Sequence, residues 1–228
     1  MKRAAFLLGC CAAAVICAGC GDDSSQTSAT DPSIPVTEGF PLYGPGPHWI
    51  DGVRSGTVTF DALAVVGVDV NGDEVADLTF QVSGPTTVFR SAAHATDPAD
   101  LRHRNHLDLE IVSMALTAQG VAFRAGDGIG NFVSDGALFS LGSSDESAAA
   151  PELAHDAFAI YFEGEVSGLA LHNEAPLLMV ADIDRLPPIG NVFQLSGPPL
   201  PLFKENGNPS GFQITSVTYT PLDPNRPR

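Results

Sequence analysis

The stretch Gly56-Thr-Val-Thr-Phe60 alternates between polar and apolar side chains, and Asp77-Leu-Thr-Phe-Gln-Val82 repeats this alternation further along the chain. A period of two places the apolar residues of each stretch on one face, as in a half-buried β-strand. Between them, Leu63–Val70 is rich in β-branched residues and largely apolar, which is typical of a buried strand. These three runs, separated by turn residues, predict a β-sheet protein.

Similar short runs continue to the end of the chain, separated by Gly, Asp, Asn and Pro, and no run of ten or more residues keeps a clean helical period. We interpret Ser143–Ala150 as a polar loop, and we expect one short helix from Asp97 to His103. The pattern predicts an all-β fold, an antiparallel β-sandwich or barrel-like body with at most one or two short helices. The further predicted strands are Thr86–Arg90, Leu107–Leu116, Val121–Arg124, Ala137–Leu141, Ala157–Phe162, Gly168–His172, Leu177–Ile183, Val192–Leu195 and Phe212–Tyr219.

Composition excludes some classes of partner. The 228 residues carry a formal net charge of −16, with 27 acidic side chains against 11 Lys and Arg. Nucleic-acid binding needs clustered cations, so we expect no nucleic-acid partner. The same charge argues against electrostatic adsorption to anionic lipid.

The N-terminus has the features of an export signal. Lys2 and Arg3 precede an uncharged run from Ala4 to Ala18, which is long enough for a signal peptide and too short to span a membrane. The run leads into Cys17-Ala-Gly-Cys20, which resembles the lipobox of bacterial lipoproteins, with Cys17 at the place usually held by Leu. This resemblance implies lipidation of Cys20 and attachment to a membrane through the acyl chains. An ordinary cleaved signal peptide is the alternative.

These features divide the chain into three parts. Residues 1–19 are predicted to be the signal peptide, 20–48 the lipidated cysteine with a flexible Pro-, Gly- and Ser-rich linker, and 49–228 a single β domain with a short disordered tail. In the bacterial lipoproteins that this segment resembles, Asp directly after the lipidated cysteine favours retention in the inner membrane, and here Gly21 takes that place. We therefore expect the outer membrane or cell surface, with the periplasmic face as the alternative.

One loop carries the pattern of a calcium ligand set. Asp69, Asn71, Asp73 and Asp77 place side-chain oxygens at loop positions 1, 3, 5 and 9, and the carbonyl of Val75 would supply position 7. Calcium takes six to eight such oxygens. The alternative is a solvated hairpin turn, because Asn-Gly is itself a strong turn signal.

The same loop resembles the calcium loops of dockerins, thrombospondin type 3 repeats and integrin-like propellers. It departs from them at position 6, where Glu74 replaces glycine and must adopt a positive φ or force another turn, and at position 12, where Phe80 stands. The resemblance covers about ten residues and implies calcium as a structural ion, without any of those folds.

A second group of polar residues contains three histidines. His94, His103 and His106 lie close together in the sequence, and the last two have the i, i+3 spacing of one helical face. They would bind zinc with His94 as third ligand, although Arg102 and Arg104 disfavour a dication. The alternative is an exposed polar segment between strands.

Two functional hypotheses follow. The first is a membrane-anchored secreted lipoprotein with no enzymatic activity, a calcium-stabilised β module that binds an envelope protein or glycan or serves the envelope structurally. The second is a tethered extracytoplasmic hydrolase with a site assembled from distant acidic and His residues, among them His103, His106 and His155. Because the chain has no nucleophile elbow, His-Glu-x-x-His or phosphate loop, we favour the first.

Overall fold

The computed structural model describes residues 43–95, 105–126 and 139–223. All of these residues belong to one compact unit of the chain, Ser33–Arg228. The described elements confirm the all-β prediction: a short 3-10 helix is followed by strands. They are η1 Trp49–Gly52, β1 Gly56–Asp69, β2 Leu78–Arg90, β3 His94–Ala95, β4 Asn105–Ala118, β5 Val121–Gly126, β6 Leu141–Glu146, β7 Ala154–Ile160, β8 Phe162–Val166, β9 Leu169–His172, β10 Leu177–Ile183, β11 Phe193–Leu195, β12 Leu200–Lys204 and β13 Pro209–Pro221.

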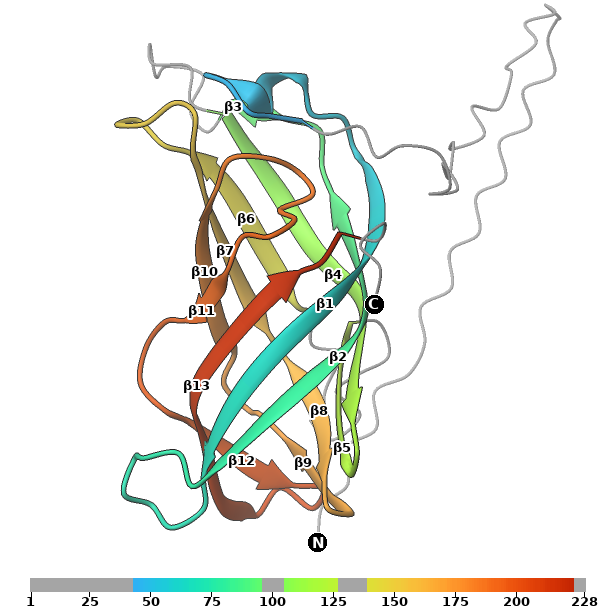
Figure 1. The fold of residues 1–228 in the computed structure, drawn as a ribbon, viewed down its shortest axis with the longest axis vertical. Helices are drawn as coiled ribbons and strands as arrows, with labels where there is room; N and C mark the ends of the chain where they lie inside the picture. The colour runs from blue at the N-terminus through green and yellow to red at the C-terminus, as the bar shows by residue number, and fades with distance from the viewer. Residues whose placement is uncertain (1–42, 96–104, 127–138, 224–228) are drawn as a thin grey trace, which may run out of the picture. The chain divides into compact units, whose positions relative to one another are not determined.

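The strands form one antiparallel sheet that closes on itself. Strand β1 pairs with β2 along one edge and with β13 along the other, so the path β1-β2-β4-β5-β8-β9-β12-β13 returns to β1. Figure 1 shows β13 lying beside β1, although the two are far apart in sequence. A second path, β6-β7-β10-β11, joins β4 to β13. The body is therefore barrel-like, and the closure removes the exposed sheet edge that a single open sheet would have.

Strand β1 shows how the sequence builds the interior. Its alternation runs from Thr57 to Val66, where every second side chain points inward and is almost completely buried, and Gly67–Asp69 are then all buried. The inward residues are Val58, Phe60, Ala62, Ala64, Val66 and Val68.

A β-bulge in β4 changes which positions face inward. Ile111 is buried, and the next buried side chain is Met114 rather than residue 113. The register with β2 shifts at the same place, between Thr87 and Val88. The extra residue explains why the polar–apolar alternation that begins at Leu107 changes phase after Ile111.

The predicted strand boundaries need several corrections. Strands β3 and β8 were not predicted, and the predicted strand Ala137–Leu141 coincides with β6 only at Leu141. Gly56–Phe60 and Leu63–Val70 are parts of one strand, β1, and β2 likewise continues through Ser83-Gly84-Pro85, which separated two predicted strands. Residues 143–146, interpreted as loop, belong to β6. Strand β12 was not predicted, because Pro201 within it argues against a central strand.

Tyr43, within the segment 20–48 that is predicted as linker, already pairs with the folded body. Tyr43 exchanges two backbone hydrogen bonds with Leu186, of 3.1 and 2.9 Å. The predictions for the signal peptide, Cys20, most of the linker, the helix from Asp97 to His103 and the C-terminal tail all concern segments outside the described residues. Within the described residues, no helix has the length and apolar character required to cross a bilayer.

Candidate functional site

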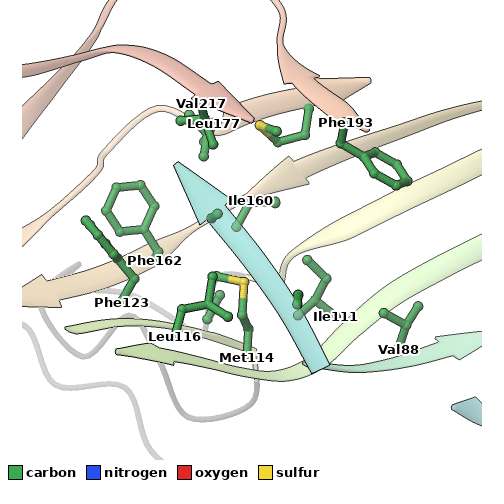
Figure 2. Close-up of a cluster of buried hydrophobic side chains, with 14 of the residues drawn as sticks. Val88, Ile111, Met114, Leu116, Phe123, Ile160, Phe162, Leu177, Phe193 and Val217 are labelled. Atoms are coloured by element: carbon green, nitrogen blue, oxygen red, sulfur yellow. The ribbon is translucent and has the colours of Figure 1, made fainter. Parts of the chain in front are cut away.

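The inner face of the closed sheet lines a partly open apolar cavity of about 80 Å³. A single water molecule needs roughly 10–15 Å³ by this kind of measure, so the volume of the cavity is larger than that of an ordinary packing defect. Figure 2 shows side chains that line it, contributed by β2, β4, β5, β7, β8, β10, β11 and β13. These residues are Val88, Ile111, Met114, Leu116, Phe123, Ile160, Phe162, Leu177, Phe193 and Val217.

Asp156 is the acidic side chain in this lining. It lies on β7 with 1% of its surface exposed, and neither carboxyl oxygen makes a hydrogen bond of normal geometry. Burial raises the pKa of Asp156 to about 8; the Ser144 hydroxyl acts in the opposite direction, and the charge of Asp145 adds to the rise. The carboxyl group is therefore mostly protonated and neutral at pH 7, and it can donate as well as accept a hydrogen bond.

Two further polar residues, Thr86 and Tyr219, line the cavity. Tyr219 of β13 and Thr86 of β2 both contribute to the lining, and the Tyr219 hydroxyl and Thr86 Oγ1 are buried without a hydrogen bond of normal geometry. Burial raises the pKa of Tyr219, which stays neutral, while the Thr86 hydroxyl acts weakly against that rise. Buried polar groups are normally paired, so these atoms are exceptions that need an explanation.

The cationic side chain in the lining is already engaged. The Arg90 guanidinium lies 5.4 Å from the centre of the Tyr43 ring, and its Nε donates to the carbonyl oxygen of Arg54 at 3.1 Å. The described lining contains no histidine, serine or cysteine. The arrangement therefore offers hydrogen-bonding groups to a bound molecule.

The predicted calcium loop, Asp69–Asp77, lies between β1 and β2, away from this cavity lining. Asp69 is fully buried, and its carboxylate accepts hydrogen bonds from the amides of Asn71, Gly72 and Glu74 and from Gln213 Nε2, at 2.6–2.8 Å. The Gln213 side chain and these amides hold the pKa of Asp69 well below its usual range.

The predicted ligands Asp73 and Asp77 accept hydrogen bonds from within the loop. Asp77 accepts hydrogen bonds from the Val70 amide at 2.9 Å and from Asn71 Nδ2 at 3.0 Å, and Asp73 accepts one from the Val75 amide at 2.9 Å. Glu74 has a φ of 64°, the left-handed conformation that its place in the loop requires. The loop brings Asn71 and Asp77 into contact, whereas Asp69, Asp73 and Asp77 do not form one of the described groups whose ligand atoms all lie within 4.8 Å of one another. Calcium binding stays a prediction.

The histidines are arranged differently from the helical prediction. His106 lies on strand β4, where its register partner is His94 on β3, and His103 is outside the described residues. Asp108 lies beside this cross-strand pair, and one ligand atom from each of the three residues lies within 4.8 Å of the others. His155, named in the hydrolase hypothesis, lies elsewhere, half exposed and paired with Asp182 at 3.0 Å.

Sequence reasoning missed the polar residues of the cavity. Asp156 occupies an inward position in the alternation of Ala154–Ile160, and an acidic residue at such a position is the signal that would have identified it. Tyr219 and Thr86 gave no signal, because both residue types are common in strands.

Comparisons with known proteins extend to the fold alone. No protein-family model matches this sequence, and no curated protein matches it. Among solved structures, the chain is similar to DynF from the dynemicin biosynthesis pathway of Micromonospora chersina, with a TM-score of 0.60 and 18% sequence identity. The match covers 82% of this chain and 89% of DynF. At this identity the similarity shows a shared fold.

Proposed function

We propose that this protein is a lipid-anchored binding protein that holds a small, mainly apolar molecule inside its closed sheet. The observation that carries the proposal is the apolar cavity, into which Asp156, Thr86 and Tyr219 bring buried polar atoms without a hydrogen bond of normal geometry. Ligand sites in proteins typically combine an apolar lining with a few placed polar groups.

Two energetic costs support a bound molecule. Protein interiors are close-packed, so an unfilled cavity forfeits dispersion contacts along its whole lining. A buried polar group without a partner costs about 1–3 kcal/mol. A guest that fills the space and hydrogen-bonds to Asp156 or to the Tyr219–Thr86 pair offsets both costs, so we expect it to carry at least one hydrogen-bonding group.

The N-terminal sequence supplies the proposed location. The lipobox ending at Cys20 and the proline-rich linker support export and attachment to a membrane through acyl chains, with the outer membrane or cell surface as the expected site. In this account the body is held close to the bilayer, where apolar molecules concentrate, and calcium stiffens the Asp69–Asp77 loop as a structural ion.

A fluorescence titration tests the proposal. A form of the chain that begins at Gly21 is titrated with N-phenyl-1-naphthylamine, a neutral dye whose emission rises in apolar surroundings. Ala64→Leu adds volume to an inward side chain of the lining, and Val65→Leu changes its outward neighbour as a matched control. We expect saturable binding that Ala64→Leu weakens at least about tenfold and Val65→Leu leaves unchanged, since a tenfold loss corresponds to about 1.4 kcal/mol. Absence of saturable binding, or equal affinity in all three proteins, contradicts the proposal.

A further inference from the structure

Strands β3 and β4 bring two histidines and an aspartate together on one face of the sheet. His94 lies directly opposite His106 in the antiparallel register, and Asp108 follows two residues after His106 on the same strand. Residues at i and i+2 of a strand point to the same face, and so do cross-strand partners. The two imidazole rings are accordingly close, with centroids 5.0 Å apart and planes at 71°.

The ligand atoms have a separation that suits a metal ion. His106 Nε2 lies 3.2 Å from Asp108 Oδ1, and His94 Nε2 lies 3.9 Å from Asp108 Oδ2. Zinc–nitrogen and zinc–oxygen bonds of about 2.0–2.2 Å in a tetrahedron place neighbouring ligand atoms about 3.3–3.5 Å apart. The first separation already matches. His94 Nε2 lies beside the other carboxylate oxygen, and one ligand atom from each of the three residues lies within 4.8 Å of the others, so His94 and Asp108 must move closer to share one ion. His94 and Asp108 are 50% and 69% exposed, so their side chains are free to make that movement.

The other nitrogen of each ring is held by a hydrogen-bond acceptor. His106 Nδ1 lies 2.7 Å from Asp145 Oδ1, and His94 Nδ1 lies 3.3 Å from the carbonyl oxygen of Ala92. Asp145 is itself oriented by the Ser143 hydroxyl, which donates to it at 3.2 Å. Metal-binding histidines generally donate their second N–H to a carboxylate or carbonyl in this way, which fixes the ring and leaves the Nε2 lone pair for the metal.

We propose that His94, His106 and Asp108 form a site for a divalent transition-metal ion, with Zn²⁺ as the best fit. Two imidazoles and one carboxylate suit zinc, whereas calcium and magnesium take oxygen ligands. Asp108 and Asp145 carry two negative charges that the dication balances. Three protein ligands leave the fourth position of the tetrahedron for water or for a donor from another molecule.

A second cluster nearby, His48, Asp51 and Glu146, provides an internal comparison. Glu146 is buried and already accepts hydrogen bonds from the Asn105 amide and pairs with His48 Nδ1, while Asp51 accepts from the Asn105 side chain. These hydrogen bonds connect η1 and β6 to the first residue of β4. We therefore expect zinc affinity to fall when His94 is replaced and to stay unchanged when His48 is replaced.

Competition titration with a chromophoric chelator measures zinc binding to the full chain after removal of metal. We expect one Zn²⁺ per chain, and tetrahedral Co²⁺ absorption when cobalt replaces zinc. His94→Ala and Asp108→Asn should each weaken zinc binding at least tenfold, and Asp145→Asn about 10–100-fold through the orientation of His106. His155→Ala, which removes another half-exposed His–Asp pair, is the matched control and should leave the affinity unchanged.

Three results would overturn the proposal: no stoichiometric binding, equal affinity in the His94→Ala variant, or loss of binding in His48→Ala instead. Thermal unfolding of each metal-free variant shows whether it is folded. His94 lies half exposed on a two-residue strand, so we expect its replacement to leave the metal-free melting temperature unchanged.

Discussion

Asp156 on β7 lies directly opposite Ser144 on β6, and both side chains are buried on the inner face of the sheet. Neither makes a hydrogen bond of normal geometry. The sheet thus holds a neutral carboxyl group against an apolar cavity, which costs stability in the empty protein and provides a donor to a bound molecule.

This carboxyl group makes stability depend on pH. The folded chain keeps the proton up to about pH 8, whereas the unfolded chain releases it above the ordinary pKa of 3.8. The contribution of Asp156 is therefore most favourable below pH 3.8, and stability falls as the pH rises from about 4 to about 8. At roughly 1.4 kcal/mol per unit, the loss by pH 7 is on the order of 4 kcal/mol.

Asp156→Asn should remove this dependence, because the amide does not titrate. Urea unfolding at several pH values between 4 and 8 measures it. Asp182→Asn, a change at an exposed aspartate of the neighbouring strand β10, should keep the slope of the unaltered protein. An equally steep fall of stability in the Asp156→Asn protein would mean that this carboxyl group is not the titrating group.

Asn173 stabilises the break between β7 and β8. It is buried; its Oδ1 accepts a hydrogen bond from the Phe162 amide at 2.7 Å, and its Nδ2 donates to the carbonyl oxygens of Ile160 and Ala175 at 2.9 and 2.7 Å. Asn173→Ala leaves these backbone groups without partners, and we expect a loss of about 3 kcal/mol in the free energy of unfolding.

Chemical denaturation gives the value for Asn173. The control is Asn191→Ala, which removes one exposed hydrogen bond to Asp182 and should cost less than about 1 kcal/mol. Equal effects of the two substitutions would show that the β7–β8 junction does not depend on the Asn173 side chain.

The sequence predicted the fold class and most strands because period-two alternation survives in single strands such as β1. It did not predict where a strand continues through a turn-like motif. Ser-Gly-Pro occurs at 83–85, where β2 continues, and also at 196–198, just after β11 ends. The cavity depends on closure of the sheet, which only long-range pairing such as β1 with β13 creates. The His94–His106 pair depends in the same way on the register of β3 and β4.

Gly84 explains why β2 continues through this motif. A Cβ atom at residue 84 would lie 2.0 Å from the carbonyl oxygen of Ala115, and the φ of 159° is unfavourable for other residues. Gly84→Ala should therefore destabilise the protein by about 2 kcal/mol or more. Gly56→Ala is the matched control in a strand, because a Cβ atom there meets nothing within 4 Å; a similar melting temperature for both variants would argue against the close approach.

Calcium should stabilise the loop between β1 and β2. With a dissociation constant of about 0.1–1 mM, ~2 mM calcium adds roughly 0.7–1.8 kcal/mol, a rise of a few degrees in melting temperature over EDTA. Asp73→Ala removes a predicted ligand that makes one hydrogen bond within the loop, and it should abolish the shift. Asp182→Ala, far from the loop in sequence, should retain it. A melting temperature that calcium leaves unchanged would make Asp69–Asp77 a hairpin turn without an ion.

The most direct test of ligand binding is a crystal structure of the chain from Gly21 under xenon pressure. Xenon enters apolar cavities without needing a hydrogen bond, and its anomalous signal locates it independently of the protein density. We predict a xenon peak inside the closed sheet, among Met114, Phe123 and Phe162, that Ala64→Leu displaces. Side chains that fill this space and leave no xenon peak would contradict a binding cavity.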